Sequence, residues 1–238
     1  MLDFPAAGEA LWAITSATGI KPEWLLPVLW LESGFNPAIP NGAGQPFYGL
    51  NQASVSLISQ YAGTDPQTYL TWSASQQLNT VVAGYMKGLV SSYGALRSAT
   101  RCYQANFLPG TLHTARQLSD IITASPSAFY NANSGLDVNH DGAITVGDLA
   151  ANMKRAASTP QVQSAITQTY ALKDSASPFS SSPNDINEIV YGEDFSVTDR
   201  YPVGSSIALA VLLGSLGLGV GYAIESGAAK RLYRRYLR

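Results

Sequence analysis

Glu32 is the residue whose type and setting most clearly indicate chemistry. It lies in the segment PEWLLPVLWLESGFNP. The positions i, i+3, i+4 and i+7 are occupied by Leu25, Val28, Leu29 and Glu32, so Glu32 lies on the apolar face of the predicted helix. A carboxyl group on an apolar face is poorly solvated, which disfavours its charged form and raises its pKa. A carboxylic acid that stays protonated near neutral pH can act as a general acid. The alternative is a glutamate at a helix end that faces solvent or pairs with a base, although Lys21 is too far along the helix for an i,i+4 pair.

Acidic residues are scarce in the segment that follows Glu32. Between Ser33 and Ser119 the sequence contains one, Asp65, in the expected loop AGTDPQ. Glycosidases that hydrolyse with two carboxyl groups hold both beside the scissile bond. A mechanism with a single acid, in which the substrate supplies the nucleophile, therefore fits this region better than hydrolysis with water positioned by Asp65 or by polar side chains.

A second group of residues indicates a calcium loop. The segment DVNHDGAITVGD offers oxygen ligands at positions one, three, five, seven, nine and twelve, with the main-chain carbonyl at position seven: Asp137, Asn139, Asp141, Ala143, Thr145 and Asp148. Gly142 at position six permits the sharp turn that such loops require. The alternative is a turn rich in Asx residues that binds no ion. The loop resembles that of EF-hands and, with Asp in the last position, the dockerin half-repeat. Because there is only one such loop, we expect a structural Ca²⁺ site and no cofactor for catalysis.

The elements that must position these residues are expected to be helices. Hydrophobic periodicity and glycine stop signals predict helices over residues 6–18, 24–33, 54–61, 74–93, 96–104, 115–123, 146–156 and 162–171, with Pro22 suited to a first turn. No segment alternates convincingly as a strand. The predicted class is therefore all-α.

The carboxyl-terminal part of the chain indicates a membrane anchor. Residues 203–224 contain no charged residue and would span about 33 Å as a helix, enough for a bilayer core. Five basic residues and one acidic residue follow in 225–238, whereas 1–224 carry nine basic and fifteen acidic residues. This asymmetry favours a tail near anionic lipid and argues against nucleic-acid binding. Small residues at four-residue spacing in the span would permit self-association (Ser206, Ala210, Gly214, Gly217, Gly221).

Residues 173–202 are expected to be a linker, Ser/Pro-rich at first and then acidic. The first residues lack a basic segment before a long apolar run, so we expect no secretory signal peptide there. The single cysteine, Cys102, excludes an internal disulfide and a cysteine-based metal cluster.

Four motifs in the amino-terminal half occur in the order found in one family. They are ESGFNP from Glu32, YGLNQ from Tyr48, LNTVVAGYM from Leu78 and CYQANFLPG from Cys102. Together they resemble the soluble-type lytic transglycosylases, relatives of goose-type lysozyme, over residues 19–110. The resemblance implies a lysozyme-like helical domain over 1–125, extended by the calcium loop and its helices over 126–172.

The same resemblance implies a function for each matched residue. Glu32 would protonate the glycosidic oxygen between N-acetylmuramic acid and N-acetylglucosamine, and the muramic six-hydroxyl would then close onto the anomeric carbon to give an anhydro sugar. Ser33 would help to position Glu32, and the hydroxyl of Tyr103 would lie near it. Gln52 would line the sugar site, and Tyr48 and Asn106 would also contact substrate. The sequence departs from the family pattern at Asn51, where methionine is usual, and at Gln104, where asparagine is usual.

The expected protein is a membrane-anchored enzyme that acts on peptidoglycan glycan strands, with its catalytic domain on the membrane side opposite the basic tail. Its setting would be either the membrane of a bacteriophage virion, where it would open the cell wall locally during genome entry, or a bacterial cell envelope. Two alternatives are a lysozyme-type hydrolase on the same fold and a membrane protein that binds peptidoglycan without catalysis. The complete glutamate motif favours an enzyme, and the scarcity of carboxylates favours the transglycosylase.

Overall fold

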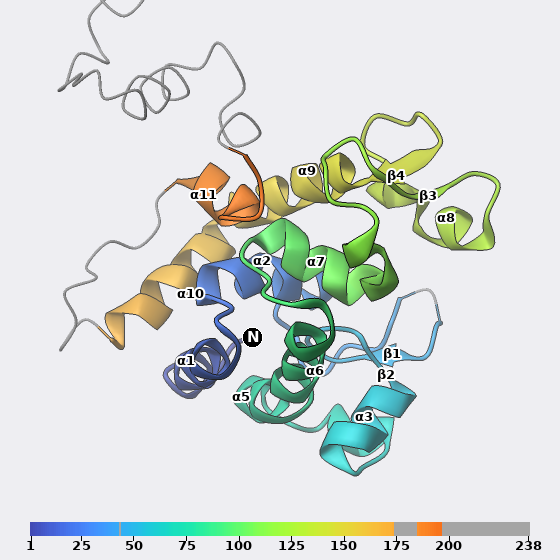
Figure 1. Ribbon diagram of the computed structural model, residues 1–238. Coiled ribbons are helices and arrows are strands. Elements are labelled where there is room, and N and C mark those ends of the chain that lie inside the picture. The colour runs from blue at the N-terminus through green and yellow to red at the C-terminus, as the bar shows by residue number, and fades with distance from the viewer. Residues whose placement is uncertain (43, 174–184, 197–238) are drawn as a thin grey trace, which may run out of the picture. The chain divides into compact units, whose positions relative to one another are not determined.

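The first two helices end at glycines, as the sequence predicts. α1 (Ala6–Thr18) ends at Gly19 and α2 (Pro22–Ser33) ends at Gly34, with φ angles of 76° and 59°. Glycine adopts this left-handed conformation without the steric cost that a Cβ imposes. These elements come from a computed structural model, which describes residues 1–42, 44–173 and 185–196 (Figure 1).

α2 is the central helix of the compact unit Met1–Asp194. It packs against α7 (Ala99–Phe107), α9 (Val146–Ala157) and α10 (Pro160–Ala171), and Figure 1 shows it in the middle of these helices. Leu25, Leu26, Val28 and Leu29 are at most 1% exposed. Each such side chain contributes about 1.5–3 kcal/mol through its burial. The helix that carries Glu32 is therefore firmly fixed in the core.

The segment predicted as one helix over 74–93 is helical throughout but changes its winding. α5 (Ala74–Gln77) continues through a π-helical turn, Leu78–Val82, into α6 (Ala83–Tyr93). Leu78, Val81 and Val82 are fully buried, and this part of the helix packs against α1 and α3 (Val55–Ala62). Single π turns are rare in proteins, and those that occur are often found at functional sites.

The described part of the chain is mostly helical, but it also contains two small hairpins that the sequence analysis missed. β1 (Phe47–Tyr48) pairs with β2 (Ala53–Ser54), and β3 (Ile121–Ala124) pairs with β4 (Ala143–Thr145), both antiparallel. Strands this short carry too little periodicity to be recognised in a sequence. Two short helices were also missed, α4 (Pro66–Tyr69) and α8 (Ala128–Asn133).

The prediction of a helix over 115–123 is wrong. The Asp120 carboxylate accepts the backbone N–H groups of Arg116 and Gln117 at 2.6 and 2.8 Å, which closes a turn. The carbonyls of Leu118 and Asp120 accept from Gly147 and Val146 at the start of α9. Because these backbone groups bond across the chain, the segment forms a turn and a strand and not a helix.

Other predicted helices have displaced boundaries. The helix predicted over 96–104 runs from Ala99 to Phe107, because the Ser98 hydroxyl caps its first turn by accepting from the Arg101 N–H at 3.1 Å. It is followed by the 3-10 helix Pro109–His113. The predicted helix over 162–171 begins at Pro160, with Thr159 as its cap.

A last helix, α11 (Ile186–Tyr191), packs against α9 and α7. This helix lies within residues 173–202, which were expected to be a linker. The Thr100 hydroxyl donates to the Val190 carbonyl at 2.7 Å, and the Asp194 carboxylate accepts from the Arg97 N–H at 2.7 Å. Within the described residues no helix has both the length and the apolar character needed to cross a bilayer. The predicted span over 203–224 and its basic tail lie outside the described residues.

Candidate functional site

The centre of the candidate site is a contact between the carboxyl ends of two packed helices. Glu32 is in the last turn of α2, and Asn106 is in the last turn of α7. The Asn106 side-chain amide donates to Glu32 Oε1 at 3.0 Å and lies 3.4 Å from the Asn51 carbonyl oxygen. Two residues that are 74 positions apart in the sequence, in two different motifs, are thus joined by one hydrogen bond.

The environment of Glu32 keeps its carboxyl group protonated to unusually high pH. The residue as a whole is partly exposed, but protein atoms surround the carboxyl densely. Burial raises the pKa of Glu32 from 4.5 to about 7, while the hydrogen bond from Asn106 opposes the shift. No charged side chain contributes to the shift among the described residues. A carboxyl whose pKa is raised toward neutral pH is suited to donate a proton and then accept one.

Two tyrosines lie within electrostatic reach of Glu32. Tyr103 is 4% exposed, and its pKa is raised by burial and then by the charge of Glu32. The Tyr85 hydroxyl donates to the Ala105 carbonyl at 3.3 Å. Burial raises the pKa of Tyr85 to about 12, with smaller contributions from neighbouring tyrosines and from Glu32. Both tyrosines therefore stay neutral and can act only as hydrogen-bonding groups.

Tyr85 is a residue that the sequence analysis did not select. Its hydroxyl comes next to the site because the side chain reaches from α6 to the Ala105 carbonyl of α7. The signals in the sequence were its place in the motif LNTVVAGYM and a polar atom at the end of a side chain on an otherwise apolar face.

The other residues expected at the substrate site have different settings. Ser33 is 7% exposed, and its hydroxyl donates to the Leu29 carbonyl of its own helix at 2.9 Å. The Gln52 side chain donates to the Gly49 carbonyl at 3.1 Å and closes the turn between β1 and β2. Tyr48 is partly exposed on β1. The structure thus places Asn106 on Glu32 and Tyr103 near it, whereas Ser33 and Gln52 bond to neighbouring backbone.

Asn51 is unusual because its amide group has no partner. The residue is 2% exposed, and neither its side-chain nitrogen nor its oxygen has a hydrogen-bond partner. Leaving a buried polar group unpaired costs about 1–3 kcal/mol. This is the position at which the transglycosylase motif usually has methionine, an apolar residue that would carry no such cost.

Asp65 has a structural role in this fold. Its Oδ1 accepts the N–H groups of Gln67 and Thr68 at 2.9 and 3.0 Å, and its Oδ2 accepts the Thr68 hydroxyl at 2.8 Å. These bonds cap α4 and hold the pKa of Asp65 below its usual value. Its carboxylate is therefore engaged at a helix amino terminus.

The loop predicted to bind calcium has several features of an ion site. Asp137 is 1% exposed, and its Oδ2 accepts from the Tyr130 hydroxyl and the Gly142 N–H, at 2.8 and 3.0 Å. Its Oδ1 is buried without any partner. Asn139 and Asp141 bond to each other at 2.9 Å. Gly142 has a φ of 88°, as the turn at position six requires.

The residues at the final positions of the loop cap the following helix. The Thr145 hydroxyl caps α9, and the Asp148 carboxylate accepts a hydrogen bond from the Thr145 N–H at 2.9 Å. The other Asp148 oxygen accepts from the Val138 N–H at 3.0 Å. In the part of the chain that the structure describes, no three His, Cys, Asp or Glu side chains converge as an ion site. Asp137 offers a free oxygen to a cation that prefers oxygen ligands. The side-chain oxygens of Asn139 and Asp141 accept hydrogen bonds within the loop, and Asp148 is directed at backbone.

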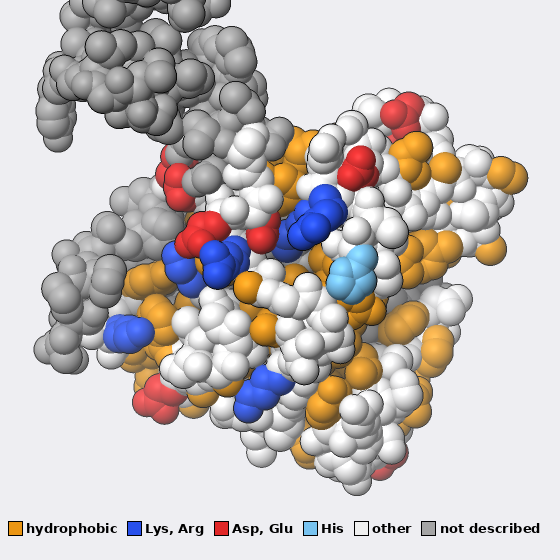
Figure 2. All heavy atoms as spheres, in the orientation of Figure 1, with side chains coloured by type: hydrophobic (Ala, Val, Ile, Leu, Met, Phe, Trp, Pro, Cys, Tyr) orange, Lys and Arg blue, Asp and Glu red, His pale blue; other side chains and the backbone are white. Residues whose placement is uncertain are grey.

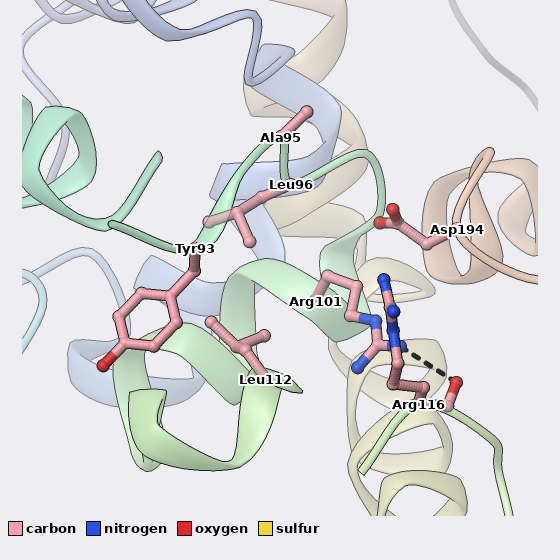
Figure 3. A pocket seen from close by; sticks show the side chains of 7 residues that line it. All are labelled: Tyr93, Ala95, Leu96, Arg101, Leu112, Arg116 and Asp194. Atoms are coloured by element: carbon pink, nitrogen blue, oxygen red, sulfur yellow. Dashed lines mark hydrogen bonds between the residues drawn. The ribbon is translucent and has the colours of Figure 1, made fainter. Parts of the chain in front are cut away.

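A cavity of about 310 Å³ lies at the opposite end of α7 (Figure 3). Figure 3 shows Arg101, Arg116 and Asp194 along one side of it and Tyr93, Leu96 and Leu112 along the other. Arg101 donates to the carbonyls of Ala115 and Arg116 at 2.7 and 2.9 Å. The arginine thereby stabilises the turn that replaces the helix predicted over 115–123, and none of the residues around Glu32 lines this cavity.

Comparison with known proteins adds no relative. No family model, no curated protein and no solved structure matches this chain.

Proposed function

We propose that this protein is a lytic transglycosylase that cleaves peptidoglycan glycan strands, with Glu32 as its only catalytic carboxyl group. The observation that carries the proposal is the pairing of a densely surrounded carboxyl, whose pKa is about 7, with the Asn106 amide. The order of the four motifs supports the same reaction class. At neutral pH Glu32 is present in both protonation states, and each half of the reaction needs one of them.

The proposed reaction needs no group beyond Glu32 and the substrate. Protonated Glu32 donates its proton to the glycosidic oxygen, and the bond from that oxygen to the muramic C1 breaks. The Glu32 carboxylate then accepts the proton of the muramic six-hydroxyl, whose oxygen bonds to C1. The products are a free N-acetylglucosamine end and a 1,6-anhydromuramic end, and Glu32 is protonated again.

Asn106 is proposed to control the second half of this reaction. Its amide donates to Glu32 Oε1, which stabilises the carboxylate that forms once the proton has left. Tyr103 and Tyr85 remain neutral beside it, and they can orient substrate hydroxyls without adding charge. None of the described carboxylates other than Glu32 contributes to this hydrogen-bond network, and Asp65 caps α4. A single-acid reaction is therefore favoured over hydrolysis with two carboxyl groups.

The proposal includes a membrane anchor at 203–224 and a structural Ca²⁺ in the 137–148 loop. The uncharged span and the basic tail support the anchor. The partnerless oxygen of buried Asp137 supports the ion, which Asn139 and Asp141 would also bind. The ion would stabilise the loop, and it has no part in the reaction. A virion membrane or a bacterial envelope would provide this setting.

The test uses the full-length protein in detergent and peptidoglycan sacculi. Glu32→Gln removes the transferable proton and should reduce activity by several orders of magnitude. Glu23→Gln is the matched control, because Glu23 lies on the same helix, is 4% exposed and also has a pKa raised by burial. Mass spectrometry of the products should show anhydromuramic ends. Reducing ends would instead establish a hydrolase, and an active Glu32→Gln variant would refute the catalytic assignment.

A further inference from the structure

A row of three aromatic rings leads away from the Glu32 site. The Tyr103 and Phe107 rings are nearly parallel, with centroids 6.0 Å apart and an interplanar angle of 23°. Phe107 in turn meets Phe129, with centroids 5.0 Å apart and an angle of 46°. The row begins at the buried tyrosine beside the catalytic carboxyl and ends at an exposed side chain on α8.

The outer rings of this row remain accessible. Phe129 is 37% exposed and Phe107 is partly exposed, whereas Tyr103 is 4% exposed. Figure 2 shows hydrophobic side chains along the right edge of the molecule, both beneath α8 and over the region of β1 and β2. Phe47 on β1 is a further exposed aromatic residue, at 38%. Leaving several rings in water forgoes the stabilisation that burial would give each of them.

The lobe that carries Phe129 is held in place by polar contacts. The Ser127 hydroxyl caps α8 by accepting from the Tyr130 N–H at 3.1 Å, and it lies 2.9 Å from the Thr123 hydroxyl of β3. The Tyr130 hydroxyl donates to Asp137, the first residue of the calcium loop, at 2.8 Å. Phe129 is thus presented by a short helix whose first turn is held by these bonds. A fixed ring provides a contact surface with little loss of conformational entropy on binding.

We propose that Phe107 and Phe129 form a sugar-binding platform for the glycan strand, beyond the sugars that flank the scissile bond. The inference rests on the proposed function. Sugar rings present C–H faces that pack on the electron-rich faces of aromatic side chains. The ring row connects the platform to Tyr103, which lies within electrostatic reach of Glu32, so the platform lies on the side of the site toward α8. The loop lobe, which lies outside the segment that resembles transglycosylases, thereby contributes to substrate binding.

The test measures binding separately from catalysis. The full-length Glu32→Gln protein is titrated with N-acetylglucosamine oligomers of increasing length, with and without a second substitution. Phe129→Ala should weaken binding of long oligomers about three- to tenfold and leave binding of the shortest unchanged. Phe129→Tyr should retain affinity, and Phe129→Leu should lose it. Ile121→Ala is the control, since this residue belongs to the same lobe, is 61% exposed and has no aromatic ring.

In the otherwise wild-type enzyme, Phe129→Ala should raise KM for long glycan strands and leave kcat unchanged. Equal affinity of the Phe129→Ala and parent proteins for long oligomers would overturn the platform. Equal affinity of the Phe129→Leu and Phe129→Tyr variants would also overturn it, because Phe107 and Phe129 would then only pack the lobe against α7. A change of solution mass without a change in glycan binding would assign the surface to a second copy and would also overturn it. Failure of the proposed function has a different signature, namely an active Glu32→Gln parent or no glycan binding by any variant.

Discussion

Removing the Asn106 amide should shift the pH dependence of the proposed transglycosylase activity in a direction that the structure fixes. The amide donates to Glu32 Oε1 at 3.0 Å and so stabilises the charged carboxylate. In Asn106→Ala this stabilisation is lost while the burial that raises the pKa remains. The pKa of Glu32 should therefore rise above its value of about 7.

The size of the shift follows from the strength of the hydrogen bond. A hydrogen bond to a charged group contributes about 1.5–3 kcal/mol, and one pKa unit corresponds to about 1.36 kcal/mol. The alkaline limb of kcat/KM, which reports protonated Glu32 in the free enzyme, should move up by about one to two pH units. The absolute rate should fall, because the carboxylate that forms during the reaction is less stable.

The assay is the release of soluble glycan from sacculi between pH 5 and 10, with Asn79→Ala as a control at an exposed position on the α5–α6 helix. The control should keep the wild-type profile. If the limb of Asn106→Ala stays where the wild-type limb lies, either the hydrogen bond does not act on the titrating group or Glu32 is not that group. An acid-ward movement would contradict the stated role of the amide directly.

Stability provides an independent readout of the same coupling. The folded pKa of Glu32 is above its value of 4.5 in an unfolded chain, so the folded state binds the proton more tightly. The stability that protonation contributes is complete below about pH 4.5 and is lost as pH rises through about 7, a difference of about 3 kcal/mol. Chemical unfolding at several pH values should show this loss, and Glu32→Gln should remove it. A pH dependence that persists in Glu32→Gln would assign the loss to other groups.

Two further predictions concern stability away from the reaction. Added Ca²⁺ should raise the melting temperature, by a shift equivalent to about 2.7 kcal/mol at a hundredfold excess over Kd, and Asp137→Asn should abolish the effect. Equal melting curves in calcium and in chelator would exclude the site. Asn51→Leu replaces an unpaired buried amide with an apolar group of similar size, so the free energy of unfolding should increase by about 1 kcal/mol or more, measured by urea denaturation. A decrease would indicate that a bound water satisfies this amide in solution.

Local sequence signals were sufficient for the ends of the first two helices and for the expected character of Glu32. Gly19 and Gly34 end their helices with positive φ angles, as predicted, because a residue without Cβ is favoured there whatever surrounds it. The apolar spacing before Glu32 predicted a poorly solvated carboxyl with a raised pKa, and the structure places this carboxyl among dense protein atoms. These properties depend on residues within a turn or two of the chain, so their spacing alone indicates them.

Tertiary structure decided which groups meet. The sequence named Asn106 as a substrate residue, but only the packing of α7 on α2 places its amide on Glu32. The segment 115–123 has helical periodicity, yet bonds from the start of α9 and from Arg101 draw its backbone into a turn and a strand. Phe129 joins the ring row because β3 pairs with β4 and holds α8 beside α7. Such contacts link residues distant in sequence, and their energies depend on separations that a one-dimensional pattern does not contain.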